Sequence, residues 1–85
     1  MLQKMASAME IPEDLSDHAT LIEIAGNHKI RIENYVRMVE YSDSKLVMQC
    51  KCYRLFISGN AFTLSLFSKT ELILCGNIEM IEFKK

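Results

Sequence analysis

The sequence predicts an all-β protein: antiparallel β-hairpin repeats that form a small sandwich, a roll or a repeated sheet, preceded by a short N-terminal helix. Two observations lead to this prediction. From Thr20 onward, short segments alternate apolar and polar side chains, and the dipeptide Gly-Asn recurs between them. A chain of 85 residues accommodates one domain. We therefore expect a single β-repeat domain over residues 20–85, after an N-terminal helix and linker over residues 1–19.

The N-terminal helix is predicted from the apolar spacing of Leu2, Met5, Ala6 and Met9, which places these side chains on one helix face. Pro12 would end the helix. This helix either packs loosely on the domain or lays its apolar stripe on a partner or a membrane surface. The segment lacks the pattern of a signal peptide, and no apolar run of the sequence is long enough to span a bilayer.

The β pattern divides into six segments. They are Leu21–Ile24, His28–Glu33, Leu46–Ile57, Phe62–Leu66, Glu71–Cys75 and Met80–Phe83. Most of them alternate apolar and polar residues, which is typical of strands with one buried face. The run from Leu46 to Ile57 is apolar on both faces, so we expect it in a sandwich core or at an interface.

The turns are predicted from three Gly-Asn pairs: Gly26-Asn27, Gly59-Asn60 and Gly76-Asn77. The second interval between them is about half the first, and the turn-forming cluster Ser42-Asp43-Ser44 lies near the missing midpoint. The chain therefore reads as four β–turn–β units of similar length.

Counting residues outward from the turn predicts a register for two of the three Gly-Asn turns. A two-residue loop at Gly59-Asn60 sets Ile57 opposite Phe62. A three-residue loop, 26–28, sets Ile24 opposite Ile30. The register of the third unit stays open.

Composition and cysteines exclude several classes of function. Ten Lys and Arg against eleven Asp and Glu give a net charge of −1, so no overall field attracts nucleic acid or anionic lipid. The cysteines, Cys50, Cys52 and Cys75, lack a second pair of ligands at zinc-site spacing. We interpret them as small buried hydrophobic side chains in a reducing compartment and expect no metal or other cofactor. His18 and His28 stand near no recognisable nucleophile motif, so we expect no enzyme.

Two kinds of binding function remain. Short apolar strands leave sheet edges that another copy can pair with, so we expect a homo-oligomer. The alternative is a small β-barrel RNA-binding protein. Its candidate residues are Arg31, Lys45, Lys51, Arg54 and Lys69, with Tyr35, Tyr53 and Phe56. Interspersed acidic residues and the near-neutral charge favour a protein interaction module, and we expect no nucleic-acid partner.

Several phrases of the sequence occur together in one known family. They are Ile24–Asn27, Ile30–Tyr35, Val39–Tyr41, Leu55–Asn60, Glu71–Ile78 and Ile81–Phe83. In this order they resemble the YabP/YqfC family of sporulation proteins over about Leu15–Phe83, with the YqfC-like branch as the better match. The most specific phrase is Ile32-Glu33-Asn34-Tyr35. The chain departs from the family at Lys51-Cys52-Tyr53, where the family tends to place a turn glycine.

The resemblance implies a non-enzymatic role in endospore formation. It implies a small cytoplasmic protein of the mother cell that acts at the forespore membrane surface or spore envelope. It also implies a YqfD-like membrane protein as partner. The family provides no catalytic residue to carry over.

Overall fold

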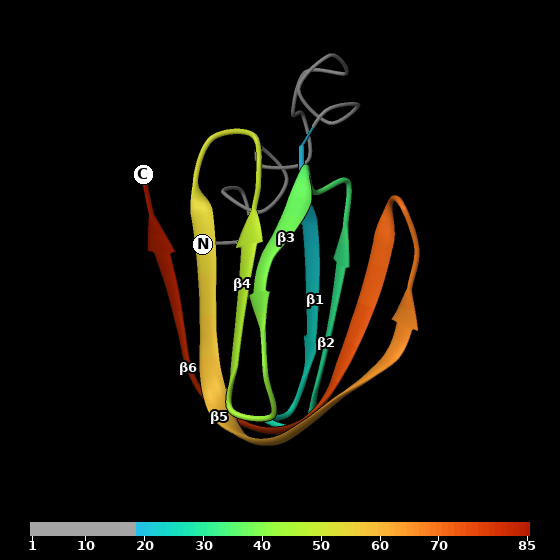
Figure 1. The fold of residues 1–85 in the computed structure, drawn as a ribbon, viewed down its shortest axis with the longest axis vertical. Helices are drawn as coiled ribbons and strands as arrows, with labels where there is room; N and C mark the ends of the chain where they lie inside the picture. The colour runs from blue at the N-terminus through green and yellow to red at the C-terminus, as the bar shows by residue number, and fades with distance from the viewer. Residues whose placement is uncertain (1–18) are drawn as a thin grey trace, which may run out of the picture.

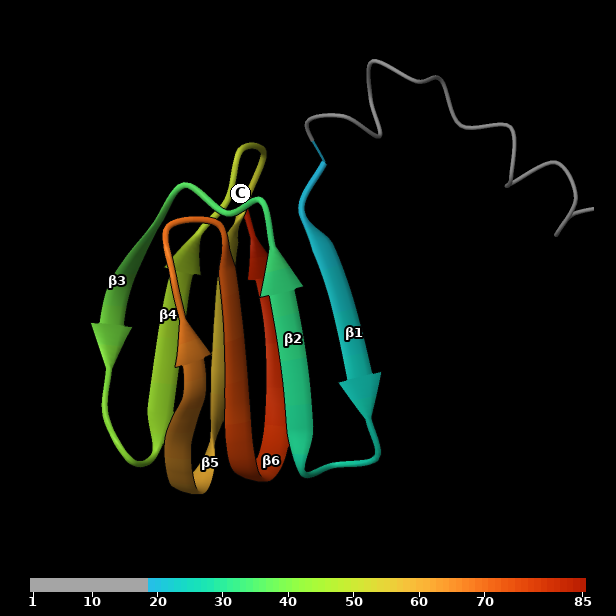
Figure 2. The ribbon, with the colours of Figure 1, turned by 90° about the vertical axis from the view of Figure 1, so that its right-hand side faces the viewer.

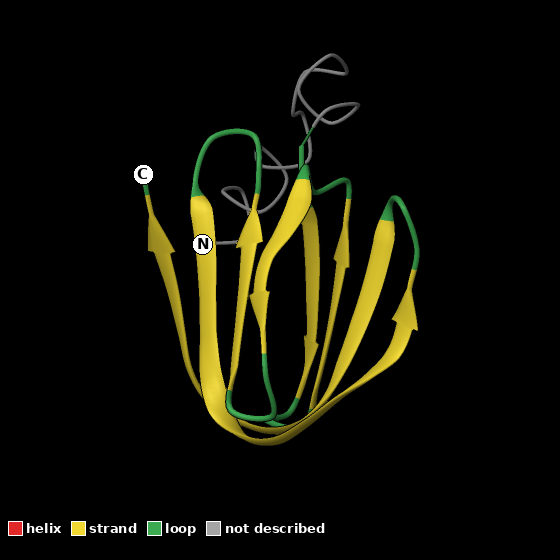
Figure 3. Ribbon diagram, in the orientation of Figure 1, coloured by secondary structure: helices red, strands yellow, loops and turns green. Residues whose placement is uncertain are grey.

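The computed structural model describes residues 19–85, and these form six strands joined by loops (Figure 3). The strands are β1 (Leu21–Ala25), β2 (Lys29–Glu33), β3 (Arg37–Tyr41), β4 (Lys45–Gln49), β5 (Arg54–Phe67) and β6 (Glu71–Lys84). They make one antiparallel sheet in the order β1-β2-β6-β5-β4-β3. The all-β prediction is confirmed, whereas the predicted N-terminal helix lies outside the described residues.

The sheet bends so that its two halves face each other (Figure 1). β5 and β6 are 14 residues long and pair along their length, from Arg54 opposite Lys84 to Phe67 opposite Leu72. One half-sheet contains β3, β4, the first half of β5 and the second half of β6. The other contains β1, β2, the first half of β6 and the second half of β5. We call the bend the closed end of this sandwich and the opposite end the open end.

Two of the three predicted Gly-Asn turns are wrong. Strand β5 runs through Gly59-Asn60 and β6 runs through Gly76-Asn77, and Asn60 pairs with Asn77. The predicted pair of Ile57 with Phe62 is therefore absent, and Ile57 pairs with Leu46 and Ile81. Both dipeptides lie at the bend, where the two strands cross the closed end together.

The glycines at the bend are required by close packing and not by a hairpin. A Cβ on Gly59 would collide with the carbonyl oxygen of Asn77. Gly76 has φ +142°, and a Cβ there would lie 2.6 Å from the carbonyl oxygen of Ala61. Ala61 itself takes a positive φ of 59°. The bend thus places two backbones closer together than side chains allow.

The remaining Gly-Asn pair lies in the β1–β2 turn, as the pattern predicts. Ile24 pairs with Ile30 and Ile22 with Ile32, which is the register expected for a three-residue loop. The cluster Ser42-Asp43-Ser44 joins β3 to β4, where the Ser42 N–H donates to Lys45 O at 2.8 Å. Both turns also lie at the closed end, so all four turn markers gather there.

Three strand predictions need correction. The expected continuous stretch Leu46–Ile57 is two strands, because the Cys50 N–H donates to Tyr53 O at 2.9 Å and closes a hairpin without glycine. The segments Phe62–Leu66, Glu71–Cys75 and Met80–Phe83, expected as separate strands, are parts of the long strands β5 and β6. β3 was not among the predicted strands, because its residues Arg37–Tyr41 contain a β-bulge that breaks the alternation.

The core lies between the two half-sheets and draws on both. Its buried side chains are Ile30, Ile32, Tyr35, Leu46, Met48, Cys50, Leu55, Ile57, Phe62, Leu72, Leu74 and Ile78. Ile30 and Ile32 come from one half-sheet and Leu55 and Ile57 from the other, and all four are fully buried. Burial of these side chains holds the halves together, since the hydrophobic effect scales with apolar area removed from water.

Candidate interaction site at the open end

The open end brings together the ends of both half-sheets. In one half-sheet, Arg37 pairs with Gln49, Gln49 with Arg54, and Arg54 with Lys84. In the other half-sheet, the terminal pairs are Leu21 with Glu33 and Glu33 with Glu71. The Val36 N–H donates to Gln49 O at 2.8 Å, so the segment between β2 and β3 joins the two halves here. The site is therefore a composite of segments far apart in the sequence.

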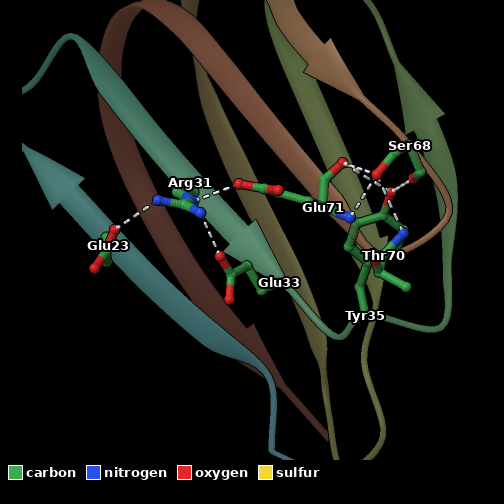
Figure 4. A network of polar contacts seen from close by, with 7 residues as sticks. All are labelled: Glu23, Arg31, Glu33, Tyr35, Ser68, Thr70 and Glu71. Atoms are coloured by element: carbon green, nitrogen blue, oxygen red, sulfur yellow. Dashed lines mark hydrogen bonds and ion pairs between the residues drawn. The ribbon is translucent and has the colours of Figure 1, made fainter.

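The segment Ile32-Glu33-Asn34-Tyr35 stabilises the open end through buried side chains and hydrogen bonds. Ile32 is in the core, and Asn34 turns the chain with φ 66°. The Asn34 backbone N–H donates to Thr70 O at 2.9 Å, and its Nδ2 donates to Ala19 O at 3.2 Å. The buried Tyr35 hydroxyl donates to Ser68 O (Figure 4). Burial raises the pKa of Tyr35, so this hydroxyl stays protonated and keeps donating.

Arg31 forms ion pairs with three glutamates on the outer face of the β1–β2–β6 half-sheet (Figure 4). Its guanidinium lies 2.6 Å from Glu71, 2.7 Å from Glu33 and 3.7 Å from Glu23. Burial lowers the pKa of Arg31, but attraction to these carboxylates outweighs it and leaves the pKa raised. Arg31 therefore stays charged and partly neutralises the acidic residues that approach the open end.

Cations line the other half-sheet at the same end. Leu55 and Ile57 point into the core, so Arg54 and Phe56 face outward. The register places Arg37 and Lys84 in the same row as Arg54. A depression of about 410 Å³ lies here, and its lining includes Gln49, Lys51, Arg54, Phe56, Lys84 and Lys85. We call Arg37, Lys51, Arg54, Lys84 and Lys85 the basic row.

Three contacts orient Arg54 and Lys84 of the basic row. Arg54 Nε donates to Gln49 Oε1 at 2.9 Å. Lys84 Nζ lies 5.2 Å from the centroid of the Phe56 ring, a cation–π contact, and 3.9 Å from Glu82 Oε2. These contacts leave the guanidinium and ammonium groups on the outer surface, where they can bind anionic groups.

Exposed apolar side chains accompany the cations. Leu21, Val36, Phe67 and Phe83 all lie near strand ends at the open end, with exposed fractions between 48% for Leu21 and 57% for Phe83. Phe83 packs edge-to-face on Tyr53, with ring centroids 5.2 Å apart. Exposed apolar residues beside a basic row are typical of an interaction surface.

Strand β1 provides a second candidate surface, its unpaired edge. It lies at one margin of the sheet and β3 at the other (Figure 2), and among described strands it pairs only with β2. Its five residues, Leu21–Ala25, contain one charge and no bulge, and Ile24 is 53% exposed. Edges of this kind are templates for pairing with another strand.

The cysteine prediction holds only in part. Cys50 is buried, Cys75 is half-buried, and Cys52 is exposed in the turn between β4 and β5. Burial raises the pKa of the Cys50 thiol, while hydrogen bonding with Thr20 and Tyr53 acts in the opposite direction. In residues 19–85, no group of three or more His, Cys, Asp or Glu side chains could hold a metal ion. Within the same range, no helix is long and apolar enough to cross a membrane.

The structure sorts the predicted site residues between the two ends. The three Gly-Asn pairs lie at the closed end, and Ile32–Tyr35 lead to the open end. Of the residues considered for RNA binding, Lys51, Tyr53, Arg54 and Phe56 come together, whereas Lys45 lies at the closed end. Sequence reasoning missed Arg37, Lys84 and Lys85, because only the strand register brings them to Arg54.

Comparisons with known proteins place the chain in a family. The chain is 27% identical over 79 residues to the uncharacterized protein YqfC of Bacillus subtilis (strain 168), covering 93% of this chain and 85% of the relative. No solved structure gives a significant match. The sequence profile of the YabP family matches residues 16–85, most of the chain. This protein therefore belongs to the YabP family, the family that the Ile32–Tyr35 phrase and the Gly-Asn repeats indicate.

Proposed function

We propose that this protein is a non-enzymatic sporulation protein that acts in the mother cell at the forespore surface or spore envelope. In this role it is a β module that pairs with copies of itself or docks onto a YqfD-like membrane protein. Membership of the YabP family, whose name is associated with sporulation, supports the setting. The surface features support a contact role, because unpaired backbone, apolar side chains and cations bind other surfaces.

The observation that carries self-association is the difference between the two outer strands of the sheet. β1 presents a regular edge whose one charge, Glu23, faces Arg31. β3 is interrupted by a register shift between Met38 and Glu40 and carries charges at Arg37 and Glu40. Bulges and charges protect an edge from pairing, so β1 is the edge that a second copy would extend.

Light scattering after size exclusion tests this proposal with a matched pair of variants. We expect the full-length protein to form an oligomer and Ile24→Lys to shift it toward monomer, because a lysine on an edge strand opposes pairing. Val39→Lys, on the bulged edge, should leave the oligomer intact. Circular dichroism verifies that both variants fold. A monomeric wild-type protein that also fails to bind a YqfD-like partner would contradict the proposal.

One observation favours a second candidate, RNA binding. Lys51, Arg54 and Phe56 share one depression with Lys84 and Lys85. Single-stranded RNA binds to such mixtures of cations and aromatic rings. A salt-dependent gel shift with single-stranded RNA at micromolar protein would support this candidate, and no shift at low salt would reject it.

A further inference from the structure

We propose that the open end is a binding face for bilayers that contain anionic lipids. The basic row contacts the headgroups, and Phe83 with its apolar neighbours enters the interface. This inference deepens the proposed function and rests on it, because contact with a bilayer specifies how the module reaches a membrane surface. Apart from Leu21, the first residue of β1, it uses residues that self-association through β1 does not require.

The first step is the distribution of charge. The whole chain carries a net charge of −1, yet the basic row gathers at one end of the sandwich. Lys69, in the turn between β5 and β6, adds a further cation to this end. Three carboxylates offset part of this charge: Glu33 and Glu71 pair with Arg31, and Glu82 lies 3.9 Å from Lys84. The basic row and Lys69 outnumber them. A locally positive surface results, and it complements an anionic bilayer.

The second step is the presence of exposed apolar side chains around these cations. Phe83 pairs with the inward-facing Leu55, so it lies at the strand end on the face opposite Lys84. Val36 precedes Arg37 in the segment between β2 and β3. Phe67 and Leu21 complete the apolar set in the other half-sheet. Side chains of this kind gain from the headgroup–acyl boundary, while neighbouring lysine and arginine bind the lipid charge.

The third step is geometry. The segment between β2 and β3, the β4–β5 turn, the β5–β6 turn and the C-terminus all lie at the upper end of the molecule in Figure 1. Hydrogen bonds connect them: Val36 N–H to Gln49 O at 2.8 Å, and Asn34 N–H to Thr70 O at 2.9 Å. The cations and the apolar residues therefore belong to one braced end and can contact one surface at the same time.

A bilayer fits this end better than a nucleic acid. Stacking with bases needs free aromatic faces, and Lys84 covers the ring of Phe56. The aliphatic side chains Leu21 and Val36 have no ring on which a base could stack, whereas a lipid interface accommodates them.

Vesicle flotation tests the proposal with the full chain. The vesicles contain phosphatidylcholine alone or phosphatidylcholine with phosphatidylglycerol. We expect binding to the anionic vesicles only, weakened by salt. The double variant K84E/K85E should lower the apparent affinity at least about tenfold, since each cation near an anionic surface contributes measurably. The matched variant K29E/K45E makes the same change in net charge at the closed end and should bind like wild type.

A separate variant tests the apolar contribution. Phe83→Asp should weaken binding to anionic vesicles even at high salt, where charge is screened. Thermal unfolding verifies that it is folded, and Phe83→Leu keeps an apolar side chain should the aspartate prevent folding. We expect Phe83→Leu to bind anionic vesicles about as well as wild type.

Four results would overturn the proposal. They are equal binding to neutral vesicles, no binding to either kind, equal losses in K84E/K85E and K29E/K45E, or full binding of K84E/K85E. Tight binding of single-stranded RNA that K84E/K85E abolishes, without vesicle binding, would replace it with the nucleic-acid function. Light scattering on the same samples separates the proposal of self-association from that of bilayer binding. An intact oligomer that does not bind vesicles contradicts only bilayer binding.

Discussion

The two ends of the sandwich differ in how closely their backbones approach and in what their surfaces carry. At the closed end, backbone groups bond to each other across the bend: the Gly59 N–H donates to Ser44 O at 3.0 Å and the Ile78 N–H donates to Asn27 O at 2.7 Å. At the open end, backbone bonds such as Val36 N–H to Gln49 O at 2.8 Å are joined by side-chain bonds from Tyr35 and Asn34. The surface of the open end carries cations and exposed apolar groups.

This difference separates the residues that make the fold from those available for binding. The Gly-Asn repeat, the most regular feature of the sequence, belongs to the closed end, where close backbone approach requires glycine at positions 59 and 76. The basic row has no regular spacing and belongs to the open end. Substitutions of the glycines at the bend should therefore affect stability, and substitutions in the basic row should affect binding.

The largest expected effect is on stability, from alanine at the bend. Gly59→Ala would place a Cβ against Asn77 O, and Gly76→Ala would strain a residue at φ +142°. We expect each variant to lose about 3 kcal/mol or more of unfolding free energy, because a backbone atom cannot move aside as a flexible side chain can. Urea denaturation followed by circular dichroism measures the loss.

Gly26→Ala is the control for these variants. Its new Cβ would meet the His28 ring at 3.1 Å, which can shift, so only the positive φ remains costly. We expect a loss of about 1 kcal/mol. Equal losses at all three glycines would contradict the distinction between a bend and a turn.

A smaller loss is expected from Tyr35→Phe at the open end. The variant leaves Ser68 O without the donor hydroxyl, which should cost about 1 kcal/mol of stability. Tyr41→Phe removes a longer contact, 3.4 Å to Phe62 O, from a more exposed side chain and should cost less. The same urea titration compares them, and a larger loss for Tyr41→Phe would conflict with the bracing role of Tyr35.

The smallest effect is a loss of stability in alkali. Burial raises the pKa of Cys50 above 9.0 and the pKa values of Tyr35 and Tyr53 above 10.0. The unfolded chain therefore releases these protons at lower pH than the folded chain, and stability falls as pH rises above about 9. Urea titrations at pH 7, 9 and 10 measure the fall. Cys50→Ala should reduce the loss of unfolding free energy that occurs near pH 9. If the variant loses as much stability as wild type, the thiol is not the cause of this loss.

Local pattern predicted some of these elements correctly. The β1–β2 hairpin and its register follow from alternation around one turn, as Ile24 opposite Ile30 shows. Gly59 and Gly76 were misassigned because their role depends on pairing between β5 and β6, which local spacing cannot reveal. The turn at Cys50–Tyr53 was hidden by an apolar run without glycine. Arg37, Arg54 and Lys84 are aligned by pairing between strands that are distant in the sequence. No local sequence motif could therefore predict the basic row.

Amide hydrogen exchange with and without anionic vesicles tests the division between the two ends most directly. Peptides that cover 34–37, 49–54 and 83–85 should gain protection when vesicles are added. Peptides that cover the closed end, 26–28, 42–44 and 76–78, should exchange at the same rate as without vesicles, and neutral vesicles should change neither set. Protection that appears at the closed end instead would contradict the account.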